Sequence, residues 1–500
     1  MPAKTGKEYI ERVDNARANV WIEGEQIQGK VSEHPAFKGV MKTQAELYDL
    51  QHDPDKKDYM TYKSPTTGDP VGTSFLQPRT KEDLEKRRMM IRTWALHHNG
   101  MMGRSPDYIN SAIMAYGAAA EMFGKQDPLF QKNMVEYYEY CRENDISLTH
   151  TLIQPQVNRS VNAARLSDPY IAARIVKKTS EGVVIRGARL LATQGGITDE
   201  IMVFPSTLLK QSDEENPYAF AFAIPNNTPG LKFICRETFD YGRSHFDHPL
   251  GSRYEEMDAI VVFDDVVVPW NRVFALGDVS ICNQAYTESN AVVHMTHQVV
   301  IKNVVKTEFI LGILQLMVET INVDQYQHIH EKMAEVIIAL EAMKAFLLAA
   351  EANAKLDRWG IMTPDFGPLN AARNYYPRIY PRFSEIMQQI GASGLMAIPT
   401  EKDFHSELRP DLDKYLQAAN GDAYERVKLF RLAWDVCMSA FGTRQTLYER
   451  FFFGDPVRMA GALYHGPTNK CMSTGSKNFW PAPTSSPSRS SLDSHPSRPR

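Results

Sequence analysis

Apolar residues recur at three- and four-residue steps directly behind one short polar run, Arg104-Ser105-Pro106-Asp107-Tyr108. Ser105 is expected to be the N-cap, Pro106 suits the first helical position, and Asp107 complements the positive end of the helix dipole. The spacing predicts a helix over 106–123 with Gly124 as its C-cap, and its apolar face comprises Ile109, Ala112, Ile113, Tyr116, Ala120 and Phe123.

The apolar period then changes twice along the chain. A second amphipathic helix is predicted around 129–141. From about residue 182 to 276 the period approaches two, which predicts short strands of a small barrel or sandwich, among them 182–190, 218–225 and 259–269. Beyond about residue 285 helical stripes return, formed by Val300, Val304, Phe309, Ile313, Met317 and Ile321, and by Val336, Ile337, Leu340, Met343 and Leu347.

The end of the chain has a different composition. Twelve of positions 481–500 are Ser or Pro and hardly any are apolar. Such a segment buries too little surface to offset the entropy of ordering it, so residues 476–500 are predicted to be a disordered tail.

Composition narrows the class of protein. A net charge of −4 argues against a nucleic-acid surface, and no apolar run approaches the length of a membrane span. The five cysteines are far apart and form no Cys-x-x-Cys pair, which is typical of a reducing compartment. These features predict a cytoplasmic protein without disulfides and without nucleic-acid or membrane partners.

Several common catalytic motifs are absent from the sequence. It has no Gly-x-Gly-x-x-Gly after a strand, no Walker-type loop and no Gly-x-Ser-x-Gly elbow. Its histidine pairs have no Glu or Cys companions in a metal-binding pattern, so no metal site is predicted.

Three polar segments remain as candidates. Arg104 stands where a guanidinium and backbone N–H groups could converge on one negative charge, although an ordinary capped helix with a solvated Arg explains the same pattern. Residues 148–159 are rich in donors, and Pro155 keeps them irregular, which suits a flat heteroaromatic ring or a satisfied interdomain loop. Thr193-Gln194-Gly195-Gly196 permits close backbone approach or is simply a turn.

Together these segments resemble the large oxygenase component of the two-component 4-hydroxyphenylacetate 3-monooxygenase family. The resemblance covers roughly residues 1–475 and rests on the segments 104–108, 150–159, 192–196, 263–270 and 447–456, which occur in the family's order. It implies a multidomain α+β, acyl-CoA-dehydrogenase-like fold, usually tetrameric. The expected parts are an N-terminal helical domain (1–147), a central β-barrel (148–278) and a C-terminal helical bundle (279–475).

The resemblance also implies the chemistry. Such enzymes take reduced FAD from a separate NADH-dependent reductase and use O₂ to form a C4a-hydroperoxide, whose distal oxygen is transferred ortho to a phenolic hydroxyl. Arg104, Tyr108 and His150 correspond to the catalytic set that binds the phenol, and Ser206 and Thr207 to contacts with its side chain. The flavin contacts implied are His150, Thr151, Leu152, Gln156, Val157, Asn158, Arg159, Thr193, Phe452, Phe453, Gly454 and Asp455.

The identity of the phenol depends on the segment around 206–210. Its hydroxyls and Lys210 favour a substrate with an acidic side chain, since an unpaired carboxylate is costly to bury. 4-Hydroxyphenylacetate, giving 3,4-dihydroxyphenylacetate, is therefore expected ahead of phenol or a chlorophenol. A 4-hydroxybutyryl-CoA dehydratase-like enzyme needs an iron–sulfur ligand set for which the cysteines are too dispersed, and a non-catalytic helical scaffold remains a further alternative.

Overall fold

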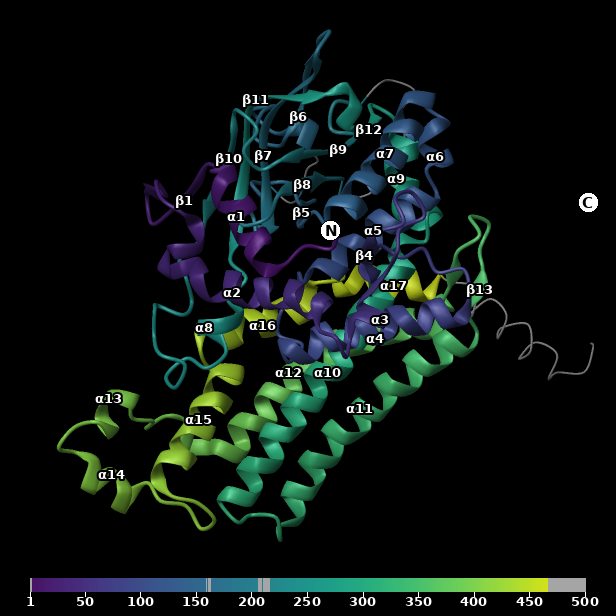
Figure 1. Ribbon diagram of the computed structural model, residues 1–500. Coiled ribbons are helices and arrows are strands. Elements are labelled where there is room, and N and C mark those ends of the chain that lie inside the picture. The colour runs from purple at the N-terminus through teal and green to yellow at the C-terminus, as the bar shows by residue number, and fades with distance from the viewer. Residues whose placement is uncertain (1, 159, 161–162, 206–208, 210–215, 466–500) are drawn as a thin grey trace, which may run out of the picture. The chain divides into compact units, whose positions relative to one another are not determined.

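A computed structural model describes residues 2–158, 160, 163–205, 209 and 216–465. The chain divides between Phe452 and Phe453 into two compact units. As predicted, the first part is mainly helical (Figure 1), with helices α1 (Gly6–Ala16), α2 (Pro35–Asp49), α3 (Lys57–Met60), α4 (Lys81–His97), α5 (Pro106–Ala118), α6 (Glu121–Gly124) and α7 (Pro128–Asn144).

Helix α5 follows the polar run but is shorter than predicted. It begins at Pro106, with Ser105 at the N-cap, and ends at Ala118; residues 121–124 form the separate helix α6. The helix ends one residue after Gly117, a residue that weakens helices. A Cβ at Gly117 would lie 2.6 Å from Cγ of Tyr138, so the glycine lets α5 pack closely on α7.

The strands form two main sheets. The six-stranded sheet has the order β2-β1-β10-β11-β7-β6 and the four-stranded sheet the order β12-β9-β8-β5. They pack on each other, and the rings of Phe222 and Phe263 meet edge to face between β9 and β11 at 6.1 Å. The strands are β1 (Val20–Ile22), β2 (Glu25–Gln26), β5 (Leu148–Thr151), β6 (Arg174–Lys178), β7 (Gly182–Thr193), β8 (Glu200–Val203), β9 (Phe220–Pro225), β10 (Leu231–Cys235), β11 (Asp258–Pro269) and β12 (Val273–Leu276).

Two sheet details position the site. Strands β7 and β11 are antiparallel and pair Thr193 with Asp258. Strand β5 runs parallel to β8 and pairs His150 with Met202 and Thr151 with Val203. Two short hairpins, β3 (Thr61–Lys63) with β4 (Pro70–Gly72) and β13 (Lys355–Leu356) with β14 (Met362–Thr363), lie outside these sheets.

The later part of the first unit is a bundle built around α10. Helix α10 packs on α4, α5, α11, α12 and α15, and α16 packs on α12 and α15 (Figure 1). A core cluster that includes Trp94 and Ile301 joins α4 to α10. The helices are α8 (Gly251–Tyr254), α9 (Val279–Glu288), α10 (Ala291–Thr320), α11 (Gln327–Ala352), α12 (Phe366–Gly391), α13 (Glu401–Phe404), α14 (Arg409–Tyr415), α15 (Ala423–Cys437) and α16 (Ala440–Phe451).

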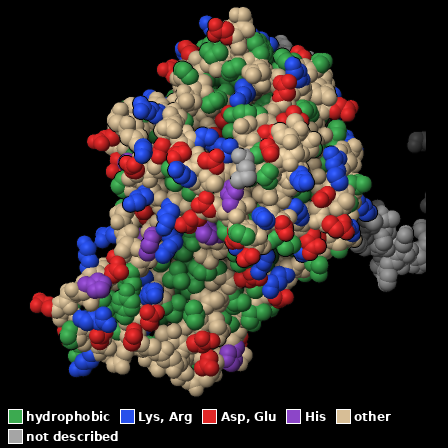
Figure 2. All heavy atoms as spheres, in the orientation of Figure 1, with side chains coloured by type: hydrophobic (Ala, Val, Ile, Leu, Met, Phe, Trp, Pro, Cys, Tyr) green, Lys and Arg blue, Asp and Glu red, His purple; other side chains and the backbone are tan. Residues whose placement is uncertain are grey.

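Part of the predicted apolar stripe of α11 faces outward. Ile337, counted in that stripe, is 46% exposed, and Ile338 and Leu348 of the same helix are 65% and 66% exposed. In Figure 2 hydrophobic side chains also gather over the long helices in the lower part of the view, whereas the upper part mixes charges of both signs. In the part of the chain that the structure describes, no helix is long and apolar enough to span a membrane.

The second unit contains helix α17 (Pro456–Tyr464). Asp455 caps it, because its carboxylate accepts a hydrogen bond from the backbone N–H of Val457 at 3.2 Å. The segment 476–500, predicted to be disordered, lies outside the described residues.

Candidate active site

The backbone before α5 is anchored by a buried carboxylate. Glu256 accepts hydrogen bonds from the backbone N–H groups of Gly103 at 2.9 Å and of Arg104 at 2.6 Å. Glu256 also forms an ion pair with Arg444 at 3.2 Å. The sequence allowed backbone N–H groups and the guanidinium of Arg104 to converge on one negative charge. The N–H groups of Gly103 and Arg104, which precede α5, are occupied by the protein's own carboxylate, so the guanidinium is the group of Arg104 that remains for a ligand.

The guanidinium of Arg104 lies among aromatic rings. Its Cζ is 4.5 Å from the ring centroid of Tyr108 and 4.6 Å from that of Phe452. Its Nη1 donates to the hydroxyl of Tyr448 at 2.6 Å and to the carbonyl of Gly103 at 3.1 Å. Burial alone would lower the pKa of Arg104, but Tyr448 and Tyr108 help to raise it above its ordinary value. A cation therefore persists here among apolar surfaces, where its field is poorly screened.

Strand β5 brings His150 to the same place. The imidazole of His150 lies 5.7 Å from the ring of Tyr108, measured between centroids. Burial, reinforced by the charge of Arg104, holds the pKa of His150 well below its usual range. His150 is thus a neutral imidazole at neutral pH, able to donate or accept one hydrogen bond at each nitrogen. Arg104, Tyr108 and His150, predicted from separate motifs, come together in the structure.

Several buried polar atoms in this region have no hydrogen-bond partner among the described residues. Among them are Nε of Arg104, Nδ1 of His150 and Oγ1 of Thr151. Unpaired buried polar atoms are costly and are usually paired in native proteins, so those of Arg104 and His150, whose side chains both lie against Tyr108, indicate a place for a polar ligand. Thr151 follows His150 on strand β5, so its side chain lies on the opposite face of the strand. We call Arg104, Tyr108 and His150 the Arg104 cluster.

The predicted flavin contacts are divided by the fold. Thr193 lies behind β5: its hydroxyl donates to Asp258 at 2.8 Å and its carbonyl accepts from the hydroxyl of Thr149 at 2.6 Å. The carbonyl of Leu152 accepts from Nη1 of Arg189 at 3.0 Å. The side chains of Gln156, Val157 and Asn158 are exposed.

Of the other predicted contacts, only Phe452 is placed beside the cluster among the described residues of the first unit. Arg159, Ser206 and Thr207 lie outside the described residues. Phe452 belongs to the first unit and touches Arg104 and Tyr108, with its ring 5.3 Å from that of Tyr108. Phe453, Gly454 and Asp455 belong to the second unit.

The sequence reasoning missed Tyr448, Glu256 and Arg444. Tyr448 stands inside the segment 447–456 that carried the family resemblance, but the flavin contacts were assigned to its end, 452–455. Glu256 and Arg444 follow no motif, and their pairing across 188 residues appears only in three dimensions.

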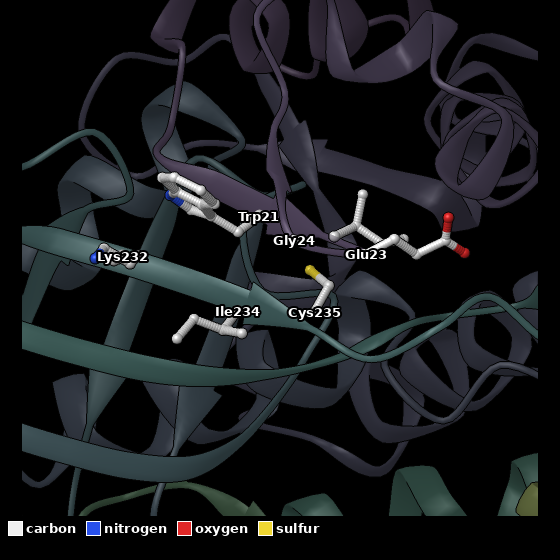
Figure 3. Close-up of a pocket in the computed structure, with 7 residues that line it drawn as sticks. Trp21, Glu23, Gly24, Lys232, Ile234 and Cys235 are labelled. Atoms are coloured by element: carbon white, nitrogen blue, oxygen red, sulfur yellow. The ribbon is translucent and has the colours of Figure 1, made fainter.

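A small surface cavity elsewhere is unrelated to these residues. It has a volume of about 180 Å³ and is lined by side chains of the adjacent strands β1 and β10, including Trp21, Lys232, Ile234 and Cys235 (Figure 3). It contains no predicted site residue, and burial raises the pKa of the Cys235 thiol to about 12, which makes the thiol unreactive at neutral pH.

The described cysteines are not arranged to bind a cluster. Cys141, Cys235, Cys282 and Cys437 are buried and free. Within the described ranges, no group of three or more His, Cys, Asp or Glu side chains could hold a metal ion.

Comparison with known proteins gives consistent matches along the chain. Family models described as 4-hydroxyphenylacetate 3-hydroxylase N terminal and C terminal match residues 5–275 and 282–470. The 4-hydroxyphenylacetate 3-monooxygenase oxygenase component of Geobacillus sp. (strain PA-9) is 57% identical over 467 residues, covering 93% of this chain and 94% of the relative. The protein of the same name from Thermus thermophilus is 52% identical over 463 residues, covering 93% and 94%.

Solved structures share the fold of this chain. The oxygenase component of 4-hydroxyphenylacetate 3-monooxygenase complexed with FAD and 4-hydroxyphenylacetate is 51% identical, with a TM-score of 0.91, covering 95% of this chain and 98% of that one. A 4-hydroxybutyryl-CoA dehydratase from N. maritimus has a TM-score of 0.86 at 20% identity, covering 95% of each chain, a likeness of fold alone. The chain belongs to the 4-hydroxyphenylacetate 3-hydroxylase family.

Proposed function

We propose that this chain is the oxygenase component of a two-component monooxygenase that hydroxylates 4-hydroxyphenylacetate ortho to its hydroxyl group. The observation that carries the proposal is the convergence of Arg104, Tyr108 and His150, with unpaired buried polar atoms beside them. The relatives named above and the structure holding FAD and 4-hydroxyphenylacetate support the choice of substrate and cofactor.

In this proposal Arg104 favours the phenolate form of the substrate. A free phenol has a pKa of about 10, so it is protonated at neutral pH unless a nearby cation lowers that value. The persistent charge of Arg104 supplies the cation, and neutral His150 supplies a hydrogen bond. An electron-rich phenolate ring is the better acceptor of an electrophilic oxygen atom.

Aromatic side chains restrict water around the reacting groups. The rings of Tyr448 and Phe452 stack at 4.8 Å, and Arg104 lies over the ring of Phe452. Excluding water strengthens the attraction between Arg104 and the phenolate.

The residues present suit FAD. When bound as reduced FAD, the cofactor supplies the activated oxygen. We assign the unpaired hydroxyl of Thr151 and the donor-rich segment 152–158 to it, with Arg159 and Thr193 completing the set. Because the sequence has no dinucleotide fingerprint, we expect the protein to purify nearly colourless and to bind reduced FAD more tightly than oxidised FAD. Anaerobic and aerobic calorimetric titrations measure the two affinities, and equal values contradict this expectation.

The remaining proposals concern the partner, location, domain boundaries and oligomeric state of the enzyme. We propose a separate NADH-dependent flavin reductase as its partner, a cytoplasmic location, and the domain boundaries 147/148 and 278/279. We also propose a homotetramer, supported by the exposed apolar side chains of α11. Light scattering during size-exclusion chromatography tests the tetramer, and a monomeric mass contradicts it.

A panel of phenols tests the function. The protein is assayed with a supplied flavin reductase, NADH, FAD and O₂, and the catechol formed is measured rather than the NADH consumed. We expect 4-hydroxyphenylacetate to give the most catechol. Catechol from unsubstituted phenol but none from 4-hydroxyphenylacetate would overturn the substrate, and none from any phenol would overturn the reaction class.

A further inference from the structure

We infer that Tyr448 is a positioning residue that holds the guanidinium of Arg104 where it meets the phenol. This inference rests on the proposed function and extends it to a residue of helix α16, 344 positions away from Arg104 along the chain.

The contact is a closed triangle of three groups. Nη1 of Arg104 donates to the hydroxyl of Tyr448 at 2.6 Å and to the carbonyl of Gly103 at 3.1 Å. The hydroxyl of Tyr448 donates in turn to the same carbonyl at 3.3 Å. Nη1 is thereby committed to the protein, whereas the buried Nε has no partner in the described chain.

Aromatic rings complete the support for the guanidinium. The ring of Tyr448 stacks on Phe452 with centroids 4.8 Å apart and planes 27° apart. Arg104 lies over Phe452 and over Tyr108, with Cζ 4.6 Å and 4.5 Å from the two centroids. A guanidinium that is hydrogen-bonded through one nitrogen and lies over two rings has few orientations left, which is the condition for electrostatic stabilisation without reorganisation.

The absence of a side chain at Gly103 leaves the space that the hydroxyl of Tyr448 occupies. A Cβ built at Gly103 would lie 2.1 Å from the hydroxyl oxygen of Tyr448. The backbone is fixed on the other side by Glu256, which accepts the N–H groups of Gly103 and Arg104. A side chain at position 103 would therefore displace Tyr448 rather than the backbone.

The hydroxyl of Tyr448 also preserves the charge of Arg104. Burial raises the pKa of Tyr448 well above its ordinary value, although Arg104 opposes the rise. Tyr448 thus stays neutral over the range in which the enzyme is assayed. A carboxylate in the same position would neutralise Arg104, whereas a neutral hydroxyl orients the cation and leaves its field for the substrate.

The test compares Tyr448→Phe with Tyr138→Phe. Tyr138 is a matched control because it is buried, donates from its hydroxyl to the carbonyl of Phe75 at 2.9 Å, and lies under Arg142 at 5.1 Å. The FAD-loaded protein is titrated with 4-nitrophenol, whose phenolate is followed by its visible absorbance. We expect Tyr448→Phe to bind this phenolate about tenfold more weakly and to convert less NADH into catechol from 4-hydroxyphenylacetate, while Tyr138→Phe matches the parent in both.

Two further variants test whether Tyr448 acts through Arg104. Gly103→Ala keeps the hydroxyl but displaces it, so its effect should resemble that of Tyr448→Phe. In an Arg104→Ala background, Tyr448→Phe should weaken phenolate binding no further, since a positioning residue has nothing left to position.

The outcomes separate the inference from the function on which it rests. Arg104→Ala binding the phenolate as the parent does, or a parent that binds none, overturns the proposed site itself. If Arg104→Ala weakens binding while Tyr448→Phe behaves like Tyr138→Phe, the positioning role alone is overturned. Additive losses in the double variant also overturn it, because Tyr448 would then contact the phenol independently.

Discussion

Two buried polar clusters meet on helix α16, and they differ in how completely their atoms are paired. In what we call the Glu449 cluster (Lys302, Lys306, Gln445 and Glu449), Glu449 accepts from Nζ of Lys302 at 2.7 Å and of Lys306 at 2.8 Å. Gln445 bridges Lys306 and the carbonyl of Met101. The Arg104 cluster contacts the residue that precedes Glu449 on the helix, Tyr448, and two of its buried atoms, Nε of Arg104 and Nδ1 of His150, have no partner among the described residues.

The difference separates stability from function. A buried ion set with every group paired breaks even or stabilises, but it becomes very costly when one partner is removed. Unpaired buried atoms destabilise the folded protein and persist where a ligand completes them. Substitutions in the Glu449 cluster should therefore lower stability, whereas those in the Arg104 cluster should lower activity.

The largest effect is expected from Glu449→Gln. It leaves two buried ammonium groups with no carboxylate, so the free energy of unfolding should fall by about 3–5 kcal/mol. Chemical denaturation measures the loss, with Glu341→Gln as the control, because Glu341 pairs with Lys344 on the exposed surface of α11.

The pH dependence of this loss provides a second check. Burial lowers the pKa of Lys306 to about 8 even with Glu449 present, so the folded state holds this proton less tightly than the unfolded state. Stability then rises with pH until the unfolded lysine also loses its proton, near pH 10.4. The deficit of Glu449→Gln should shrink from pH 7 to pH 9, and a constant deficit would show that Lys306 keeps its charge.

Arg104→Ala should cost activity instead. Loss of one preorganised stabiliser of developing charge lowers the rate by about 10²-fold or more, about 2.7 kcal/mol. The fold should survive, because Glu256 holds the backbone rather than the side chain. Lysine should rescue poorly, since it lacks the planar fork. Catechol formation and the melting temperature are measured together, with the exposed Arg358→Ala as control; hydroxylation at the parental rate contradicts the site.

A smaller effect is expected from acid, which should lower the free energy of unfolding through two histidines, His98 and His150. Burial, with the nearby charge of Lys302, lowers the pKa of His98 to about 3, and burial with Arg104 lowers that of His150. Folded pKa values below the unfolded value of about 6.5 mean that the unfolded state binds more protons, so stability falls as pH drops below 6.5. His98 should cost about 1.4 kcal/mol at pH 5.5 relative to neutral pH, and His150 should act in the same direction.

Single variants distinguish the two histidines. His98→Gln and His150→Gln should each reduce the drop in melting temperature between pH 7.5 and pH 5.5. His150→Gln alone should also lower catechol formation. The exposed His328→Gln should change neither, and an unchanged pH dependence in both buried variants would contradict the assignment.

Helices, strands and motifs that depend on neighbouring residues can be predicted from this sequence, whereas contacts between residues far apart in the chain cannot. Helix α7 and strands β7, β9 and β11 follow from apolar periodicity, and Arg104, Tyr108 and His150 from motifs that the structure brings together. Helix α5 ends one residue after Gly117, and the contact of Gly117 with Tyr138 on α7 is not contained in the apolar periodicity. Likewise, Glu256 takes the N–H groups of Gly103 and Arg104, because the residues just before β11 and those just before α5 meet only in the folded chain.

The smallest effect, and the sharpest contrast, should come from two threonines of strand β5. Thr151 has a buried hydroxyl without a partner in the described residues, whereas the hydroxyl of Thr149 donates to the carbonyl of Thr193 at 2.6 Å. Thr151→Val removes an unsatisfied group of nearly the same shape and should raise the free energy of unfolding by about 0.5–1 kcal/mol, whereas Thr149→Val should lower it by about 1 kcal/mol.

Affinity for reduced FAD should change in the opposite sense at Thr151. If the hydroxyl of Thr151 binds the flavin, Thr151→Val should bind reduced FAD several-fold more weakly although the protein is more stable. A binding site whose polar groups are unpaired without the ligand is expected to lower stability in this way. Anaerobic titration and denaturation of the two variants measure both quantities. A Thr151→Val protein that loses stability, or keeps parental flavin affinity, would show that the hydroxyl is satisfied within the protein and that the contrast between the two clusters does not extend to β5.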